Sequence, residues 1–165
     1  MRPIIPIAAR KIISPYLKAF SSKNSYKTGT KFTVQAQSRS DVYVYLIGYS
    51  SNTKLVEEIP HGDFYFDAHN RAIVLPHDKS TIILDEHVGT DYLVVLYSLE
   101  ALNIKELCKK IQATKGDDFV KRLHDAHRNK IVASENMTFD KDNIRFTAHP
   151  NGKTLLPIVI AIEHN

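Results

Sequence analysis

The stretch 42–49, with the sequence Val-Tyr-Val-Tyr-Leu-Ile-Gly-Tyr, constrains the fold of this chain more than any other segment. Successive side chains of a β-strand point to opposite faces of a sheet, and here both faces would be apolar or aromatic. A strand that is apolar on both faces has to be covered on both sides. We therefore expect residues 42–49 to lie in the middle of a sheet, with packed layers above and below it.

Residues 92–98 have the same character, because they contain an unbroken apolar run. Shorter strand-like stretches surround these two segments, and residues with turn chemistry separate them. These stretches are residues 31–38, 54–59, 64–66, 72–75, 81–84, 136–148 and 155–163. Many short strands separated by turns are typical of a β-sandwich or a barrel.

The apolar periodicity becomes helical between Asn103 and Val132. Asn103 is a candidate N-cap for a first helix, and Asp117 or Asp118 is a candidate cap for a second helix that extends to about Val132. The apolar residues of the first helix lie at helical spacing: Ile104, Leu107, Cys108 and Ile111. The sequence thus predicts a mainly β, α+β fold, an antiparallel β-sandwich of about eight or nine strands with two inserted helices.

Length and proline content predict the domain organisation. The chain has 165 residues, which is the size of one domain. Pro3, Pro6 and Pro15 argue against a long helix near the N-terminus. We expect residues 1–29 to form an arm or linker that packs on the body, in which residues 4–7 form an edge strand or a packed part of the arm. Residues 30–165 are expected to form a single sandwich domain, with residues 103–132 as its helical insertion.

Charge and composition exclude several classes of partner. The net charge of +4 is spread along the chain, and acidic residues alternate with the lysines of the helical segment, so a solvated face is favoured over a nucleic-acid patch. The single cysteine, Cys108, excludes an internal disulfide and any multi-cysteine zinc site. No apolar run approaches the roughly 20 residues that cross a bilayer. We therefore expect neither a nucleic-acid partner nor a membrane span.

Histidines and aspartates gather in the predicted loops of the β-rich region. The loops of a sandwich meet at its two ends, so these side chains can converge into a polar binding site. Asp, Asn and His also favour turns for conformational reasons alone, and this simpler explanation is preferred. The loop residues kept as binding candidates are His61, Asp63, Asp67 and His69.

Three tyrosines alternate along one face of the central strand. Tyr43, Tyr45 and Tyr49 would form a stacking platform for sugar or single-stranded nucleic acid if they were exposed. Three adjacent uncovered tyrosines would be an unusual exposed patch, so we favour cover by the helices or the arm. Tyr43 and Tyr45 are kept as binding candidates.

Catalytic signatures are missing from the sequence. No stretch matches a nucleophile elbow, a phosphate loop or a glycine-rich nucleotide fingerprint. Cys108 lies on the apolar stripe of its predicted helix, where a cysteine packs as a small hydrophobe. His124 and His127 could share a helix face, but the sequence indicates no third metal ligand. We expect no catalytic residue, no metal and no cofactor.

Four strand motifs, in this order, carry a resemblance to a known family. They are Tyr43-Val44-Tyr45-Leu46, Ile59-Pro60, Leu75-Pro76 and Gly89-Thr90-Asp91-Tyr92-Leu93-Val94-Val95-Leu96-Tyr97-Ser98. Over residues 29–102 the chain resembles an uncharacterised bacterial domain of unknown function, which is commonly appended to caspase-like peptidases, protein kinases and cell-envelope proteins. That family has no assigned catalytic residues, so the resemblance implies recognition or scaffolding.

The expected function is that of a noncatalytic accessory domain that binds a protein partner or a neighbouring domain of a larger bacterial protein. The surface would be an unpaired sheet edge or the loops at residues 61–70. A carbohydrate or envelope-glycan binding module and a hydrolase built from loop His and Asp residues are the alternatives. The resemblance implies the cell envelope or periplasm if Met1 begins a fragment, and a native Met1 implies the cytoplasm. The oligomeric state stays open.

Overall fold

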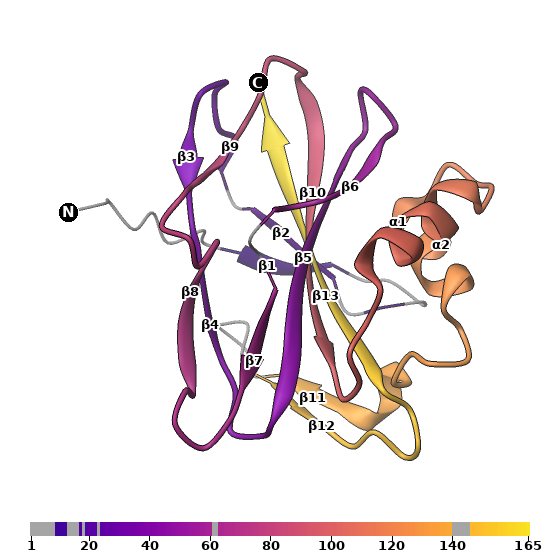
Figure 1. Ribbon diagram of the computed structural model, residues 1–165. Helices are drawn as coiled ribbons and strands as arrows, with labels where there is room; N and C mark the ends of the chain where they lie inside the picture. The colour runs from indigo at the N-terminus through magenta and orange to yellow at the C-terminus, as the bar shows by residue number, and fades with distance from the viewer. Residues whose placement is uncertain (1–8, 13–16, 18, 23, 61–62, 140–145) are drawn as a thin grey trace.

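The computed structural model describes residues 9–12, 17, 19–22, 24–60, 63–139 and 146–165 (Figure 1). Its main element is a seven-stranded sheet in the order β1-β2-β13-β10-β5-β6, in which β7 also pairs with β5. Every pairing in this sheet is antiparallel except that of β2 with β13. The strands are β1 (Ala9–Ile12), β2 (Ala19–Ser22), β5 (Val42–Ser50), β6 (Val56–Glu58), β7 (Phe64–Phe66), β10 (Gly89–Ser98) and β13 (Leu155–His164).

Three small two-stranded sheets accompany the large one. β3 (Lys31–Phe32) pairs with β9 (Ile82–Ile83), and β4 (Val34–Gln37) pairs with β8 (Ala72–Leu75). Because β3 runs into β4 along the chain, these two sheets together form one interrupted ribbon, which we call the β3/β4–β8/β9 ribbon. The third sheet pairs β11 (Met137–Phe139) with β12 (Phe146–Ala148).

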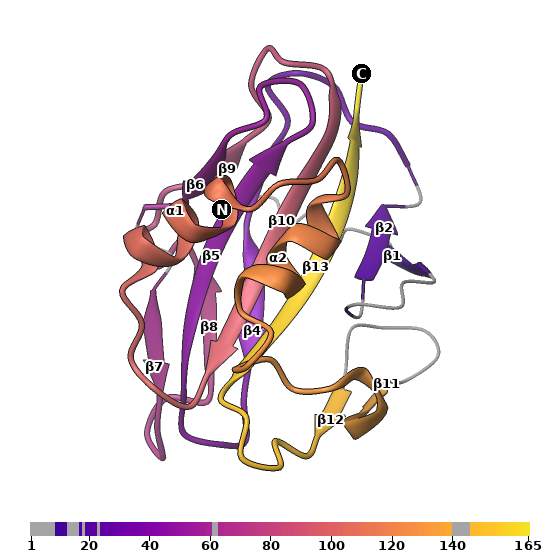
Figure 2. The same ribbon diagram turned by 90° about the vertical axis from the view of Figure 1, so that its right-hand side faces the viewer.

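The ribbon and the β11–β12 pair cover one face of the large sheet, and the helices cover the other face (Figures 1 and 2). Under the ribbon, Phe66 and Leu75 are fully buried together with the β5 side chain Val44. The helical layer consists of α1 (Ile104–Ala113) and α2 (Phe119–Ala126), and a short 3-10 helix, η1 (Ser134–Asn136), directly precedes β11. Ile111 and Leu123 of this layer have no exposed surface and pack over the face that carries Ile47.

The strand at residues 42–49 occupies the predicted position. β5 pairs with β10 on one side and with β6 and β7 on the other. Val44 and Ile47 point to opposite faces of the sheet, and both are completely buried. The prediction of an interior strand that is covered on both faces is therefore confirmed.

The helix N-termini also follow the sequence signals. The side chain of Asn103 accepts a hydrogen bond from the amide of Glu106, and that of Asp118 accepts one from the amide of Lys121. Both bonds satisfy amides that the first turn of a helix leaves without an intrahelical partner. None of the helices among the described residues is long and apolar enough to cross a membrane.

Three features differ from expectation. The fold is mainly β with two helices, but its sheets are one large and three small ones. The second helix ends at Ala126 rather than near Val132. The backbone around Val132 is not helical because its amide donates to the carbonyl of Leu155, at the start of β13, at 2.9 Å. Residues 19–22, expected to belong to an arm, form strand β2 beside β13, with Phe20 buried. The edge strand expected at residues 4–7 lies outside the described residues.

Candidate functional site

Of the predicted loop candidates, Asp67 and His69 lie in the turn between β7 and β8, whereas Asp63 precedes β7. The Asp67 carboxylate accepts hydrogen bonds from the amides of His69 at 2.8 Å and Asn70 at 3.0 Å, and these bonds hold the pKa of Asp67 below its usual value. His69 and Asp63 are exposed. His61 lies outside the described residues. This arrangement is an Asx-type turn, in which the aspartate satisfies the local backbone.

The tyrosines of β5 differ sharply in exposure. Tyr45 and Tyr49 are only 7% and 5% exposed, and the Tyr45 hydroxyl accepts a hydrogen bond from the amide of Leu102 at 2.9 Å. Burial raises the pKa of the Tyr45 phenol, with a smaller contribution from the charge of Asp63. Tyr43 is half-buried, and its ring lies 4.6 Å from that of Tyr65, which is 43% exposed. The accessible aromatic pair is therefore Tyr43 with Tyr65.

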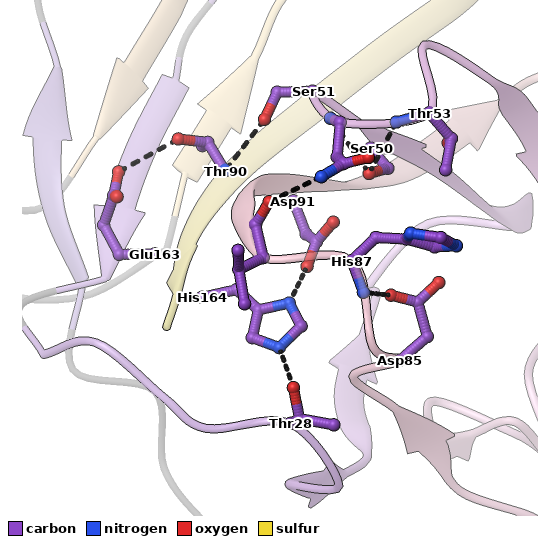
Figure 3. Close-up of polar contacts among 12 residues, drawn as sticks. Thr28, Ser50, Ser51, Thr53, Asp85, His87, Thr90, Asp91, Glu163 and His164 are labelled. Carbon is purple, nitrogen blue, oxygen red and sulfur yellow. Dashed lines mark hydrogen bonds and ion pairs between the residues drawn. The ribbon is translucent and has the colours of Figure 1, made fainter.

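A different polar cluster lies where β10 begins and β13 ends (Figure 3). The carboxylate of Asp91 lies 3.0 Å from Nδ1 of His164, and Nε2 of His164 lies 2.9 Å from Oγ1 of Thr28. The His164 side chain is completely buried, Asp91 is 21% exposed, and Thr28 is exposed. We call these three residues the Thr28–His164–Asp91 chain.

Strand register explains why His164 meets Asp91. His164 is paired with Gly89, and Asp91 with Ile162, so Asp91 and His164 are diagonal neighbours on the same face of the sheet. Segment 26–28 reaches them because the amide of Tyr26 donates to the carbonyl of Glu163 at 2.9 Å. The Thr28–His164–Asp91 chain thus joins the neighbouring strands β10 and β13 to segment 26–28, which runs alongside β13.

Burial dominates the electrostatics of Asp91. It raises the pKa of the carboxyl group, although the hydrogen bond from His164 opposes the shift. The nearby charge of Asp85 raises the pKa further, and a hydrogen bond from Ser50 lowers it. A carboxylate in this position carries a desolvation cost that an uncharged side chain would avoid.

The loop between β5 and β6 and the loop before β10, which lie beside the Thr28–His164–Asp91 chain, are hydrogen-bonded to each other (Figure 3). Ser51 Oγ accepts a hydrogen bond from the amide of Thr90 at 2.8 Å, and the Asn52 side chain donates to the carbonyl of Val88 at 3.2 Å. Gly89 has a φ of +140°, and a Cβ atom there would lie 2.7 Å from Ser51 Oγ. A side chain at Gly89 would displace the Ser51 hydroxyl and would have to adopt a φ that side chains disfavour, which explains the glycine.

The helical histidines and the cysteine serve the core. His124 pairs with Asp125 at 3.2 Å, and His127 is hydrogen-bonded to the backbone of Leu107. Burial raises the pKa of Cys108 to about 11, which keeps the thiol protonated at neutral pH. In the part of the chain that the structure describes, no three His, Cys, Asp or Glu side chains are placed to hold a metal ion.

The edges of β6 and β8 differ in how their outward backbone groups are bonded. At β6, the side-chain oxygen of Gln112 accepts a hydrogen bond from the amide of Val56, and its nitrogen donates to the carbonyl of Lys54. The edge of β8 that faces away from β4 has no such cap among the described residues, where β4 is the only strand that pairs with β8. Within β8, Ala72 and Val74 are exposed, and Val74 is 44% accessible.

Register fixes which backbone groups of β8 face outward. The amide of Ser38 donates to the carbonyl of Arg71 at 3.1 Å, so residues 71, 73 and 75 direct their backbone groups toward β4. The intervening residues, Ala72 and Val74, direct theirs away from β4. The open edge of β8 therefore presents backbone donors and acceptors beside a half-exposed valine.

Sequence patterns did not single out Thr28, His164 or the β8 edge. The only signal for the Thr28–His164–Asp91 chain is that Asp91 and His164 stand at the ends of two strongly apolar strands. No family model, no curated protein and no solved structure matches this chain. The family resemblance of its strand motifs therefore stays an expectation.

Proposed function

We propose that this protein is an accessory domain that binds a protein partner by strand addition to the open edge of β8. The observation that carries this proposal is the contrast between the edges of β6 and β8: Gln112 caps β6, whereas β8 keeps the backbone groups of Ala72 and Val74 free of any strand partner among the described residues. An extended partner segment would form main-chain hydrogen bonds with these groups. The exposed Val74 side chain would add an apolar contact.

We further propose that the ribbon and the large sheet are two unequal layers of one β-sandwich. Their facing side chains belong to one continuous apolar cluster, which supports this interpretation. A strand added at β8 would widen the smaller layer. The strand motifs favour a role beside other domains of a larger bacterial protein in the cell envelope.

Proline substitution at Val74 tests the function directly. Proline is tolerated on an edge strand where its missing N–H faces solvent, so Val74→Pro should fold while losing one donor of the open edge. Peptides selected by phage display against the folded domain should bind Val74→Pro at least about tenfold more weakly, which corresponds to one lost hydrogen bond. Val74→Thr keeps the amide and should bind normally. Equal binding to both variants would contradict strand addition at β8.

Carbohydrate binding is a second candidate, because one aromatic pair is accessible. Tyr43 and Tyr65 lie 4.6 Å apart at the end of the helix-covered face, and aromatic rings with an exposed face can stack on sugars. Tyr65→Ala would abolish binding to an immobilised envelope glycan, whereas Val74→Pro would leave it intact. Binding that survives Tyr65→Ala would exclude this site.

A further inference from the structure

We propose that the Thr28–His164–Asp91 chain is an acyl-accepting site, in which the Thr28 hydroxyl attacks the carbonyl carbon of an activated ester. This proposal goes beyond strand addition at β8 and does not depend on it. It rests on the order of three side chains: a hydroxyl, an imidazole within hydrogen-bonding distance of it, and a carboxylate on the other ring nitrogen.

The geometry gives each residue a distinct role. His164 Nε2, 2.9 Å from Thr28 Oγ1, is placed to take the hydroxyl proton. Asp91 accepts the Nδ1 proton at 3.0 Å, which selects the tautomer with a free lone pair on Nε2 and stabilises the imidazolium that forms. Nucleophilic catalysis requires a nucleophile within hydrogen-bonding distance of a base, and a third group that orients the base.

Exposure follows the same division of roles. Thr28, the residue that would meet the substrate, is exposed, whereas the His164 side chain is completely buried and Asp91 is 21% exposed. The base is thus shielded from water, while the residue that carries the hydroxyl is exposed. Shielding strengthens the electrostatic coupling between His164 and Asp91.

A purely structural role explains these residues less well. Segment 26–28 is already fastened to the end of β13 by two backbone bonds of 2.9 Å, from the amide of Tyr26 to Glu163 and from the amide of Asn165 to Tyr26. An asparagine in place of Asp91 could accept the same bond from His164 without a buried charge. Retaining a carboxylate where burial disfavours its charge is typical of functional sites.

The reaction step balances without any additional reagent. A bond forms between Thr28 Oγ1 and the acyl carbon while the bond from that carbon to the leaving oxygen breaks. The hydroxyl proton passes to His164 Nε2 and from there to the leaving alkoxide or phenoxide. Water activated by the same imidazole would then add to the acyl carbon, the bond from that carbon to Thr28 Oγ1 would break, the acyl group would leave as a carboxylic acid, and His164 would return the proton to Thr28 Oγ1.

Acylation by p-nitrophenyl acetate tests the site, with the adduct mapped by tandem mass spectrometry on the full chain. We expect Thr28 to be acetylated faster than the exposed Thr138 of β11, and Thr28→Ser to stay reactive. Thr28→Val should release p-nitrophenolate more slowly, whereas the matched control Thr138→Val should match the unmodified chain. Asp91→Asn should slow acetylation at Thr28 by about a hundredfold, in the range of general-base contributions.

Thermal unfolding of each variant separates chemistry from folding, because Asp91→Asn is expected to keep its fold. Acetylation of Thr28 no faster than that of Thr138 would overturn the proposal. An unchanged rate at Thr28 in folded Asp91→Asn would overturn it as well, since the carboxylate would then have no role in activating the hydroxyl.

Discussion

The side-chain oxygen of Gln112 accepts a hydrogen bond from the backbone amide of Val56 at 2.7 Å, and the Gln112 nitrogen donates to the carbonyl of Lys54 at 3.0 Å. A helix side chain thereby takes the place that a neighbouring strand would occupy beside β6. Unprotected edges invite pairing with other chains, and this cap prevents it at β6. The edge of β8 has no such cap among the described residues, and the proposed function rests on that edge.

Removing this cap should weaken the fold and expose the β6 edge. Gln112→Ala leaves the amide of Val56 without its protein partner, which should cost about 1–2 kcal/mol in the free energy of unfolding. Urea denaturation measures that loss, and sedimentation velocity should show more self-association than in the unmodified chain. Gln112→Glu keeps the acceptor and loses the donor, so its stability should be intermediate. Unchanged stability and association in Gln112→Ala would show that the cap is dispensable.

Arg122 is predicted to be the most important polar residue of the helical layer. It is 6% exposed, donates to the carbonyls of Thr114, Ile111 and Gln112 at the end of α1, and lies 5.5 Å from the Tyr49 ring centroid. Arg122→Met keeps the length of the side chain but removes the donor to these carbonyls, of which, among the described residues, only that of Ile111 also accepts from the amide of Thr114, so it should cost about 2–4 kcal/mol.

Arg128→Met is the matched control for this prediction. Arg128 is exposed and bonded to Asp125 at 3.0 Å, so its replacement should cost less than about 1 kcal/mol. Urea denaturation of both variants gives the comparison. Equal losses would contradict the assigned role of Arg122.

Asp125 should stabilise the protein at neutral pH. Hydrogen bonds from Lys121, Arg128 and His124 hold its pKa well below the usual value. Because the folded-state pKa is lowered, this stabilisation is fully present above the unfolded pKa of about 4 and is lost as the pH falls from there through the folded-state pKa. Asp125→Asn should therefore lower the melting temperature at pH ~7 and flatten its decline toward acid. An identical acid decline in the variant would rule out this contribution.

Asp91 should behave in the opposite way. Burial raises its folded-state pKa, so its charged form is disfavoured by folding, and the resulting penalty sets in as the pH rises above the unfolded pKa. Asp91→Asn should therefore be at least as stable as the unmodified chain at pH ~7. Thermal melts of both aspartate variants test the two signs together. A clear loss of stability in Asp91→Asn would mean that its bond to His164 outweighs desolvation.

Cys108 should be unreactive in the folded protein. Cys108 is only 7% exposed, and burial raises the pKa of its thiol to about 11. Only about one thousandth of the Cys108 side chains would therefore be thiolate at pH ~8. Modification by Ellman's reagent should be slow for the native chain and fast in denaturant. Rapid modification of the native chain would show that α1 opens readily from the sheet.

Much of this fold could be predicted from the sequence, because the features concerned are determined by residues that lie close together in the sequence. The two-faced apolar pattern at residues 42–49 identified an interior strand. Asn103 identified the start of the first helix, and Asp117 or Asp118 that of the second, where the cap is Asp118. The expected cover over Tyr45 and Tyr49 is also present. Each of these predictions needs only periodicity or a side chain that bonds within one turn of its own position.

Features that depend on pairing between distant segments could not be predicted in this way. Residues 19–22 have no strong strand pattern of their own and become β2 because β13 pairs with them. Asp91 and His164 are 73 positions apart and meet only through the register of β10 with β13. Sequence patterns indicate that strands exist, whereas register decides which of their side chains meet.

Hydrogen exchange at the amides of Ala72 and Val74, measured with and without a display-selected peptide, tests the central claim most directly. Both amides face the open edge of β8, so they should exchange rapidly in the protein alone, while the amide of Ile73, which faces β4, is protected. Bound peptide should slow exchange at Ala72 and Val74 specifically. Binding that leaves both amides in fast exchange would contradict recognition by strand addition at β8.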